Sequence, residues 1–120
     1  MCEVDRIKTA ILSNHGDRLR QRVFTEREIA YAESKASRFE RYAARFAAKE
    51  AGMKALGTGW RGGIGWRDLE VANLPTGRPT LRLHRKAAEI AAGLGVTDIA
   101  LSITHTTGQA LAMVILERRD

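Results

Sequence analysis

The sequence predicts an α+β fold in which helices pack on a small antiparallel sheet. Two observations predict it. Residues 4–56 carry apolar side chains at helical spacing, whereas residues 69–116 mostly alternate apolar and polar side chains between turn signals, as antiparallel strands do. The 120 residues are one domain's worth of sequence, without internal repeats or low-complexity tracts. We therefore interpret residues 1–120 as a single domain.

Three helices are predicted in the first half of the chain. Apolar residues recur three and four positions apart over residues 4–15, which is typical of one face of a helix. The second helix, over residues 25–34, begins with a capping box, in which Thr25 caps the helix and Glu28 reaches back to it. The third helix covers residues 37–56, and its apolar stripe consists of Phe39, Tyr42, Ala43, Phe46 and Met53.

Two hairpins and a helix are predicted in the second half. Residues 69–83 form a hairpin around the turn 75–78, and an alanine-rich helix follows over residues 85–94. Residues 99–103 and 110–116 are the strands of the second hairpin. The last strand, Ala-Leu-Ala-Met-Val-Ile-Leu, is apolar on both faces. The face that does not pack on a helix therefore needs cover, from another helix or a neighbouring subunit.

The charge balance points to anionic partners. Lysine and arginine number 20 against 14 aspartates and glutamates, giving a net charge of +6, and arginine outnumbers lysine three to one. Such a surface suits nucleic acid, an acidic protein or a phosphorylated cofactor, and charge alone does not choose among them. No apolar run is long enough to cross a membrane. Cys2 is the one cysteine, which excludes an internal disulfide and fits the cytoplasm.

Glu50 is the most informative single residue. It follows Phe46 by four positions and precedes Met53 by three, so its carboxylate lies on the apolar stripe of the third helix, where an unpaired charge is costly. Lys54 lies one turn further along the same face. On these residues alone a Glu50–Lys54 ion pair is favoured, because such pairs are common on helices. The alternative is a metal-binding carboxylate beside a lysine that holds phosphate oxygens.

Three other features could serve a ligand or a partner. The glycine-rich loop of residues 57–65 could let its backbone approach a ligand closely. It follows a helix and matches no phosphate-binding pattern, so we favour a flexible connection between that helix and the sheet. His105 ends a predicted strand, where a surface turn histidine is the simpler interpretation. Gly16 is expected to end the first helix, and a basic stretch follows it. This stretch forms either a solvated face or a docking patch for an acidic protein, through Arg18, Arg20 and Arg22.

Taken together, these motifs resemble the holo-(acyl carrier protein) synthase family. The members of this family are 4'-phosphopantetheinyl transferases. The strongest match is the stretch 45–59, RFAAKEAGMKALGTG, which has the family's form R-F-A-A-K-E-A-x-x-K-A-x-G-T-G. The second match is Leu101-Ser102-Ile103-Thr104-His105, followed by a turn and residues 112–117. Weaker matches in the right order, which extend the resemblance over nearly the whole chain, are residues 3–7, 22–25, 66–71 and 77–79.

The resemblance implies the family's transferase-like fold and its reaction. Such enzymes move the 4'-phosphopantetheine arm of coenzyme A onto a serine of an apo acyl carrier protein, release 3',5'-ADP, use Mg²⁺ and usually work as trimers with active sites between subunits. Glu50 would be a metal ligand, and Lys54 would contact the phosphates or help to activate the serine. His105, the third catalytic candidate, would lie with Arg45 near the coenzyme A phosphates. The cofactor-binding set would be Arg45, Lys54, Gly57, Gly59, His105 and Thr106. The residues that grip the acidic carrier would be Arg6, Arg18, Arg20 and Arg22.

One part of the family pattern has no counterpart. Members open with a strand of the form G-x-D whose aspartate is a second metal ligand, and that aspartate would fall just before Met1. Glu3 and Asp5 align with later helical positions, whose side chains are expected to point elsewhere. Three explanations stay open: a misplaced start, a shortened and weakened relative, or Mg²⁺ held by Glu50 with pyrophosphate and waters. We expect this chain to bind metal weakly and to transfer poorly.

Two other functions compete with transfer. A non-catalytic trimeric domain that still binds coenzyme A or carrier protein would explain the missing aspartate. A small nucleic-acid-binding protein would explain the basic charge. The aromatic residues count against the latter, because they lie on apolar stripes rather than among the arginines, where they could stack on bases. Which carrier is served, of fatty-acid or polyketide type, is left open by the sequence.

Overall fold

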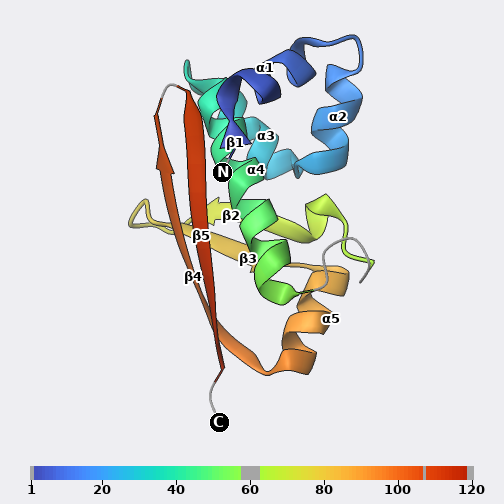
Figure 1. Cartoon of the computed structure of the whole chain (residues 1–120), viewed down its shortest axis with the longest axis vertical. Helices are drawn as coiled ribbons and strands as arrows, with labels where there is room; N and C mark the ends of the chain where they lie inside the picture. The colour runs from blue at the N-terminus through green and yellow to red at the C-terminus, as the bar shows by residue number, and fades with distance from the viewer. Residues whose placement is uncertain (1, 58–62, 107, 119–120) are drawn as a thin grey trace.

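The computed structural model describes residues 2–57, 63–106 and 108–118, and its elements follow the predicted order of helices first and hairpins later (Figure 1). This confirms the α+β fold class. The helices are α1 Val4–Leu12, α2 Gly16–Val23, α3 Glu26–Glu33, α4 Arg38–Leu56 and α5 Arg85–Leu94, with a short 3-10 turn at Trp66–Asp68. The strands are β1 Cys2–Glu3, β2 Leu69–Asn73, β3 Pro79–Leu83, β4 Val96–His105 and β5 Gln109–Arg118.

The strands form two antiparallel sheets. In one sheet β5 lies between β1 and β4, and in the other β2 pairs with β3. The β1–β5 pairing joins the two ends of the chain, because Cys2 is opposite Ala110 and Glu3 is opposite Gln109. Strand β1 pairs with β5 through these two residues only, so it does not cover the edge of β5 beyond Ala110.

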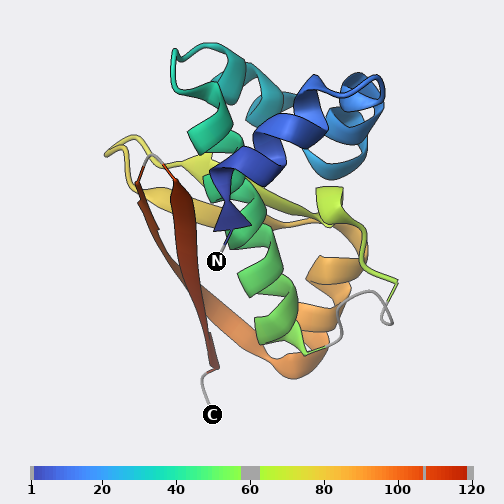
Figure 2. The same cartoon turned by 45° about the horizontal axis from the view of Figure 1, so that its top comes forward.

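Helix α4 is the centre of the molecule. It contacts the β5–β4 sheet on one side and the β2–β3 hairpin on another, while α1 and α3 pack around its N-terminal half (Figure 2). Gly52, within this helix, allows the hairpin to approach, because a Cβ there would overlap Leu69 and Leu81. No helix of the described ranges is both long and apolar enough to span a bilayer.

The prediction that Gly16 ends the first helix was wrong. Helix α1 ends at Leu12, and Gly16 begins α2 instead of ending α1. Leu19 and Val23, one turn apart, pack that helix against the α3–α4 core. A Cβ at residue 16 would overlap the Ile11 carbonyl oxygen, so glycine is required for this tight link. The other predicted helices and both hairpins are confirmed to within a few residues.

A buried ion pair ties α3 to α4 and to the hairpin. The Lys49 ammonium lies 2.7 Å from Glu28 Oε1, and both side chains are fully buried. Lys49 also donates to the carbonyl oxygens of Trp66 and Leu69, and Glu28 Oε2 accepts from the backbone N–H of Val71 at 3.0 Å. Every polar group of the pair thus has partners, which is the condition for a buried charge to be tolerated.

Replacing Lys49 with methionine is expected to destabilise the chain by about 3–5 kcal/mol, because it leaves the Glu28 carboxylate buried without its cation. Urea unfolding at one fixed protein concentration measures the loss. The double variant K49M/E28Q should regain part of it, since the amide keeps an acceptor without a charge. A double variant as unstable as the single one would contradict this interpretation of the pair.

The Glu70 side chain makes stability depend on acid pH. It accepts from the Thr25 hydroxyl at 2.5 Å and lies 3.2 Å from His84 Nε2. Burial alone would raise the pKa of Glu70, but these hydrogen bonds bring it below its ordinary value of 4.5. The stabilisation is therefore present above that value and is lost as pH falls through the depressed pKa.

The variant Glu70→Gln is accordingly expected to be less stable than the unaltered chain near neutral pH, and the gap should close at an acid pH below the depressed pKa of Glu70. Urea midpoints at the two pH values give the comparison. If the difference in stability between the two proteins is the same at both pH values, the charge of the Glu70 carboxylate does not contribute to stability.

Candidate active site

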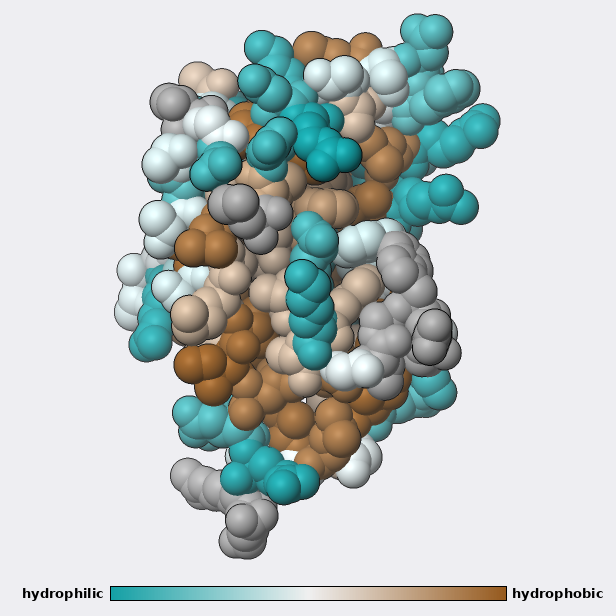
Figure 3. Space-filling view, in the orientation of Figure 1, coloured by the Kyte–Doolittle hydropathy of each residue, from teal (hydrophilic) through white to brown (hydrophobic). Residues whose placement is uncertain are grey.

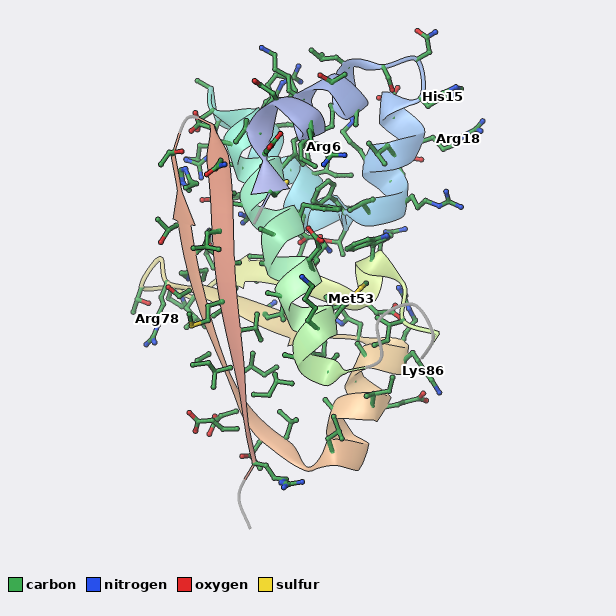
Figure 4. The ribbon with its side chains drawn as sticks, viewed as in Figure 1. Arg6, His15, Arg18, Met53, Arg78 and Lys86 are labelled. Atoms are coloured by element: carbon green, nitrogen blue, oxygen red, sulfur yellow. The ribbon has the colours of Figure 1, made fainter. Side chains whose placement is uncertain are left out.

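Glu50 lines a pocket where β1 and α1 meet α4. The pocket has a volume of about 520 Å³ and is lined by Cys2, Glu3, Arg6, Ile7, Ala10, Phe46 and Glu50. The Glu50 side chain is half-buried, and the Phe46 ring beside it stacks on Trp66 with centroids 4.9 Å apart. Arg6 comes from α1, whereas His15 and Arg18 point outward at the far side of α2 (Figure 4).

The ion pair that the residues alone favoured is absent. Among the residues with described positions, no cation lies within ion-pair distance of Glu50, and Lys54 is exposed. Burial and, after it, the Glu50 charge raise the pKa of the Cys2 thiol, which places the two side chains close together. The carboxylate thus lines the pocket without an ion-pair partner among the described residues, and Arg6 is the cation that shares the pocket.

The expectation that Glu3 occupies a helical position was wrong, because it lies in strand β1. It borders the Glu50 pocket, but its side chain is exposed and alternates to the face opposite that of Cys2. Within the described residues no group of three or more metal-ligand side chains occurs. The Glu50 carboxylate still fits Mg²⁺, because this ion is commonly held by one or two carboxylates, with waters and substrate phosphates in its other positions.

A second pocket lies on another face of α4 and brings Arg45 and His105 together. Its volume is about 170 Å³, and it is lined by Tyr31, Arg41, Ala44, Arg45, Asn73, Gly77, Pro79, Ile103 and His105. Arg45 is only 5% exposed, and burial lowers its pKa. His105 Nδ1 lies 3.8 Å from a Glu40 carboxylate oxygen. Thr106, next in the chain, closes the β4–β5 turn by accepting from the N–H groups of Gly108 and Gln109.

The remaining predicted site residues are dispersed. Gly57 ends α4 in the left-handed conformation with φ of 79°, and Gly59, with most of the glycine-rich loop, lies outside the described residues. Of the basic residues, Arg6, Arg18 and Arg22 are exposed, whereas Arg20 forms ion pairs with Asp17 and Glu33.

Sequence reasoning missed the residues that complete the second pocket. Tyr31 comes from α3, Asn73 from the end of β2, and Gly77 with Pro79 from the hairpin turn and β3. One signal was available for Arg41, because it precedes Arg45 by four positions and so shares its helical face.

Known proteins share this architecture. A family model described as the 4'-phosphopantetheinyl transferase superfamily matches residues 3–113. The class defined by the fold and the two pockets is thus that of phosphopantetheinyl transferases.

Individual relatives give the narrower assignment. A protein of Solibacter usitatus named holo-[acyl-carrier-protein] synthase is 62% identical over 98% of this chain and 93% of its own. The holo-[acyl-carrier-protein] synthase structure from Neisseria meningitidis superimposes with a TM-score of 0.87 at 26% identity, covering 98% of this chain and 93% of the other. The Bacillus anthracis synthase structure, in complex with CoA (3',5'-ADP), has a TM-score of 0.76 at 35% identity, covering 98% and 90%. The chain belongs to the holo-[acyl-carrier-protein] synthase family.

Proposed function

We propose that this chain transfers the 4'-phosphopantetheine group of coenzyme A to a serine of an apo acyl carrier protein, with Mg²⁺, and releases 3',5'-ADP. The observation that carries the proposal is the Glu50 carboxylate of the family's signature helix, which lines a pocket with Arg6 and forms no ion pair among the described residues. The names of the relatives and the bound coenzyme A product in the Bacillus anthracis structure support the same chemistry. The lone cysteine is consistent with a cytoplasmic reaction.

Positioning and charge neutralisation do most of the work in phosphoryl transfer. Glu50 would hold Mg²⁺, which when bound neutralises charge on the pyrophosphate. The carrier serine hydroxyl attacks the phosphorus that bears pantetheine, the bond to 3',5'-ADP breaks, and the serine proton is released. Lys54, exposed one turn beyond Glu50, would hold phosphate oxygens or help to activate the serine. The other cofactor contacts would come from Arg45, Gly57, Gly59, His105 and Thr106.

The carrier would dock on the basic surface of α1 and α2. Arg6, Arg18 and Arg22 are exposed there and available to an acidic helix. Arg20 belongs to the same surface but is already paired with Asp17 and Glu33, so we expect it to contribute less than the other three.

A homotrimer would cover the outer face of β5. Leu111, Met113 and Ile115 alternate along this face and are 56%, 62% and 51% exposed. Apolar residues gather over the lower half of β5 and toward α5 (Figure 3). A contiguous apolar surface of this kind marks an interface. Burial between copies would also place the Glu50 pocket of one subunit near surfaces of the next.

The intact mass of a carrier protein tests the proposal. The chain is incubated with coenzyme A, Mg²⁺ and apo carrier, and a gain of one phosphopantetheine is the expected result. A parallel sample carries Gly-Leu-Asp before Met1. In the β1 register, that aspartate would share the face of Cys2, which lines the Glu50 pocket. A gain in the extended sample alone would show that the reaction needs the aspartate before Met1 as a second carboxylate. No gain in either would overturn transfer in favour of a domain that only binds coenzyme A or carrier.

A further inference from the structure

Three donors converge on the Glu33 carboxylate, one from α2 and two from α4. Arg20 Nη1 of α2 donates to Glu33 Oε2 at 2.9 Å, and Arg38 Nη1 of α4 donates to Oε1 at 2.8 Å. The Tyr42 hydroxyl, also on α4, donates to Oε2 at 2.7 Å. Glu33 itself is the last residue of α3. One carboxylate therefore joins α2 to both α3 and α4.

The α4 side of this cluster is held by the core. Tyr42 is fully buried, and the centre of its ring lies 4.9 Å from that of Phe24. A buried phenol needs a partner for its hydroxyl, and Glu33 provides it. The hydrogen bond from Tyr42, against the opposing effect of burial and together with those from the arginines, lowers the pKa of Glu33. The carboxylate is thus charged at neutral pH and held in place from α4.

Two apolar side chains also anchor α2. Leu19 and Val23, one turn apart, face the core. Among the described residues, the Arg20–Glu33 pair is the one ion pair that joins α2 to another element. Apolar contacts are non-directional, so they resist separation of the helix better than its rotation about its own axis, whereas hydrogen bonds are directional. Arg20 is thus the contact that sets the rotation of α2.

The rotation of α2 decides where its other arginines point. Arg18 and Arg22 are one turn apart and share a face of the helix, and Arg20 lies on the other side of the apolar stripe. Both Arg18 and Arg22 are exposed, and Arg18 points outward from α2 (Figure 4). In the proposed function they act together with Arg6 of α1. Docking then needs the two helices in a defined relative orientation.

We propose that Glu33 is a positioning residue for carrier docking, which acts through Arg20 to fix α2 so that Arg18 and Arg22 are already oriented when an acidic carrier arrives. The identity of this partner rests on the proposed function. Arg20 then serves within the protein instead of contacting the carrier. The charge of Glu33 by itself weakens the attraction of this surface for an acidic protein. Positioning and charge therefore predict opposite effects when the carboxylate is removed.

Calorimetric binding of an apo acyl carrier protein separates the two effects. The variant Glu33→Gln should bind the carrier at least about threefold more weakly, because α2 loses its fixed orientation, although the surface becomes more positive. Glu26→Gln is the matched control, since Glu26 is exposed at the start of α3 and forms no ion pair in the described chain. It should bind the carrier at least as tightly as the unaltered chain. Equal or tighter binding by Glu33→Gln overturns the positioning role.

A double variant tests the route through Arg20. If Arg20 acts through Glu33, the loss of carrier affinity in Arg20→Gln/Glu33→Gln should be smaller than the sum of the two single losses, because both changes break the same contact. Losses that add in full would show that Arg20 contacts the carrier by itself, and would overturn the route.

A measurement without the carrier distinguishes this proposal from the proposed function. Amide hydrogen exchange of α2 should be faster in Glu33→Gln than in the unaltered chain, whereas exchange of residues 47–56 of α4 should be unchanged. If the unaltered chain binds no carrier while α2 exchange responds, the proposed function is wrong and the role of Glu33 in placing α2 stands. If the carrier binds and neither exchange nor affinity changes, the role of Glu33 is wrong and the proposed function stands.

Discussion

Transfer by the variant Glu50→Gln should fall by more than about 100-fold. Even groups that only orient a metal ligand cost 10–100-fold when removed, and Glu50 is the ligand itself in the proposed site. The side chain is half-buried and has no cation partner among the described residues, so its replacement breaks no ion pair that supports the fold. Carrier mass against time measures the rate.

A direct readout separates metal binding from chemistry. Mg²⁺ that binds the folded chain raises its melting temperature, and this rise should disappear in Glu50→Gln. Glu89→Gln, an exposed glutamate on α5, removes the same charge away from the pocket and should retain both the rise and the rate. Normal turnover in Glu50→Gln would rule out its role as the principal carboxylate.

Substituting Met113 by aspartate should separate the subunits and reduce transfer by more than about tenfold. A charge in the middle of the apolar face of β5 cannot be buried against another copy without a partner. In the single subunit Met113 is 62% exposed, so the fold of each chain should persist. Light scattering after size exclusion gives the mass, and the unaltered chain should have the mass of a trimer.

The matched control is Leu74→Asp. Leu74 is an exposed apolar residue between β2 and β3, away from the β5 face, and its replacement should leave the mass unchanged. If Met113→Asp keeps the mass of the unaltered chain, the β5 face is not the interface.

Local sequence signals predicted the parts of the fold that depend on neighbouring residues. The capping box of Thr25 and Glu28 forms as predicted, with both reciprocal hydrogen bonds present. Glu50 was identified because a carboxylate on an apolar stripe demands a partner, and the structure shows it facing a pocket. In both cases the residues concerned are three or four positions apart in the sequence. Helix geometry alone places such residues on the same face.

The rest depended on contacts that no local pattern contains. Helix α2 has only Leu19 and Val23 to signal it, and its first residue, glycine, more often follows a helix than begins one. Glu3 could be placed only by its pairing with Gln109, at the other end of the chain. The second pocket combines α3, α4 and the hairpin, so Tyr31 and Asn73 gave no sign in the sequence that they share a site.

The pairing of β1 with β5 sets the order in which the protein can mature. Cys2 and Glu3 form one wall of the Glu50 pocket, and their strand partners, Ala110 and Gln109, are synthesised much later than they are. Contacts between such distant segments carry the largest loop-closure cost and form slowly. A nascent chain on the ribosome can therefore complete α4, with Glu50 in place, long before the pocket around it exists. The Glu50 pocket is complete only once β1 has paired with β5.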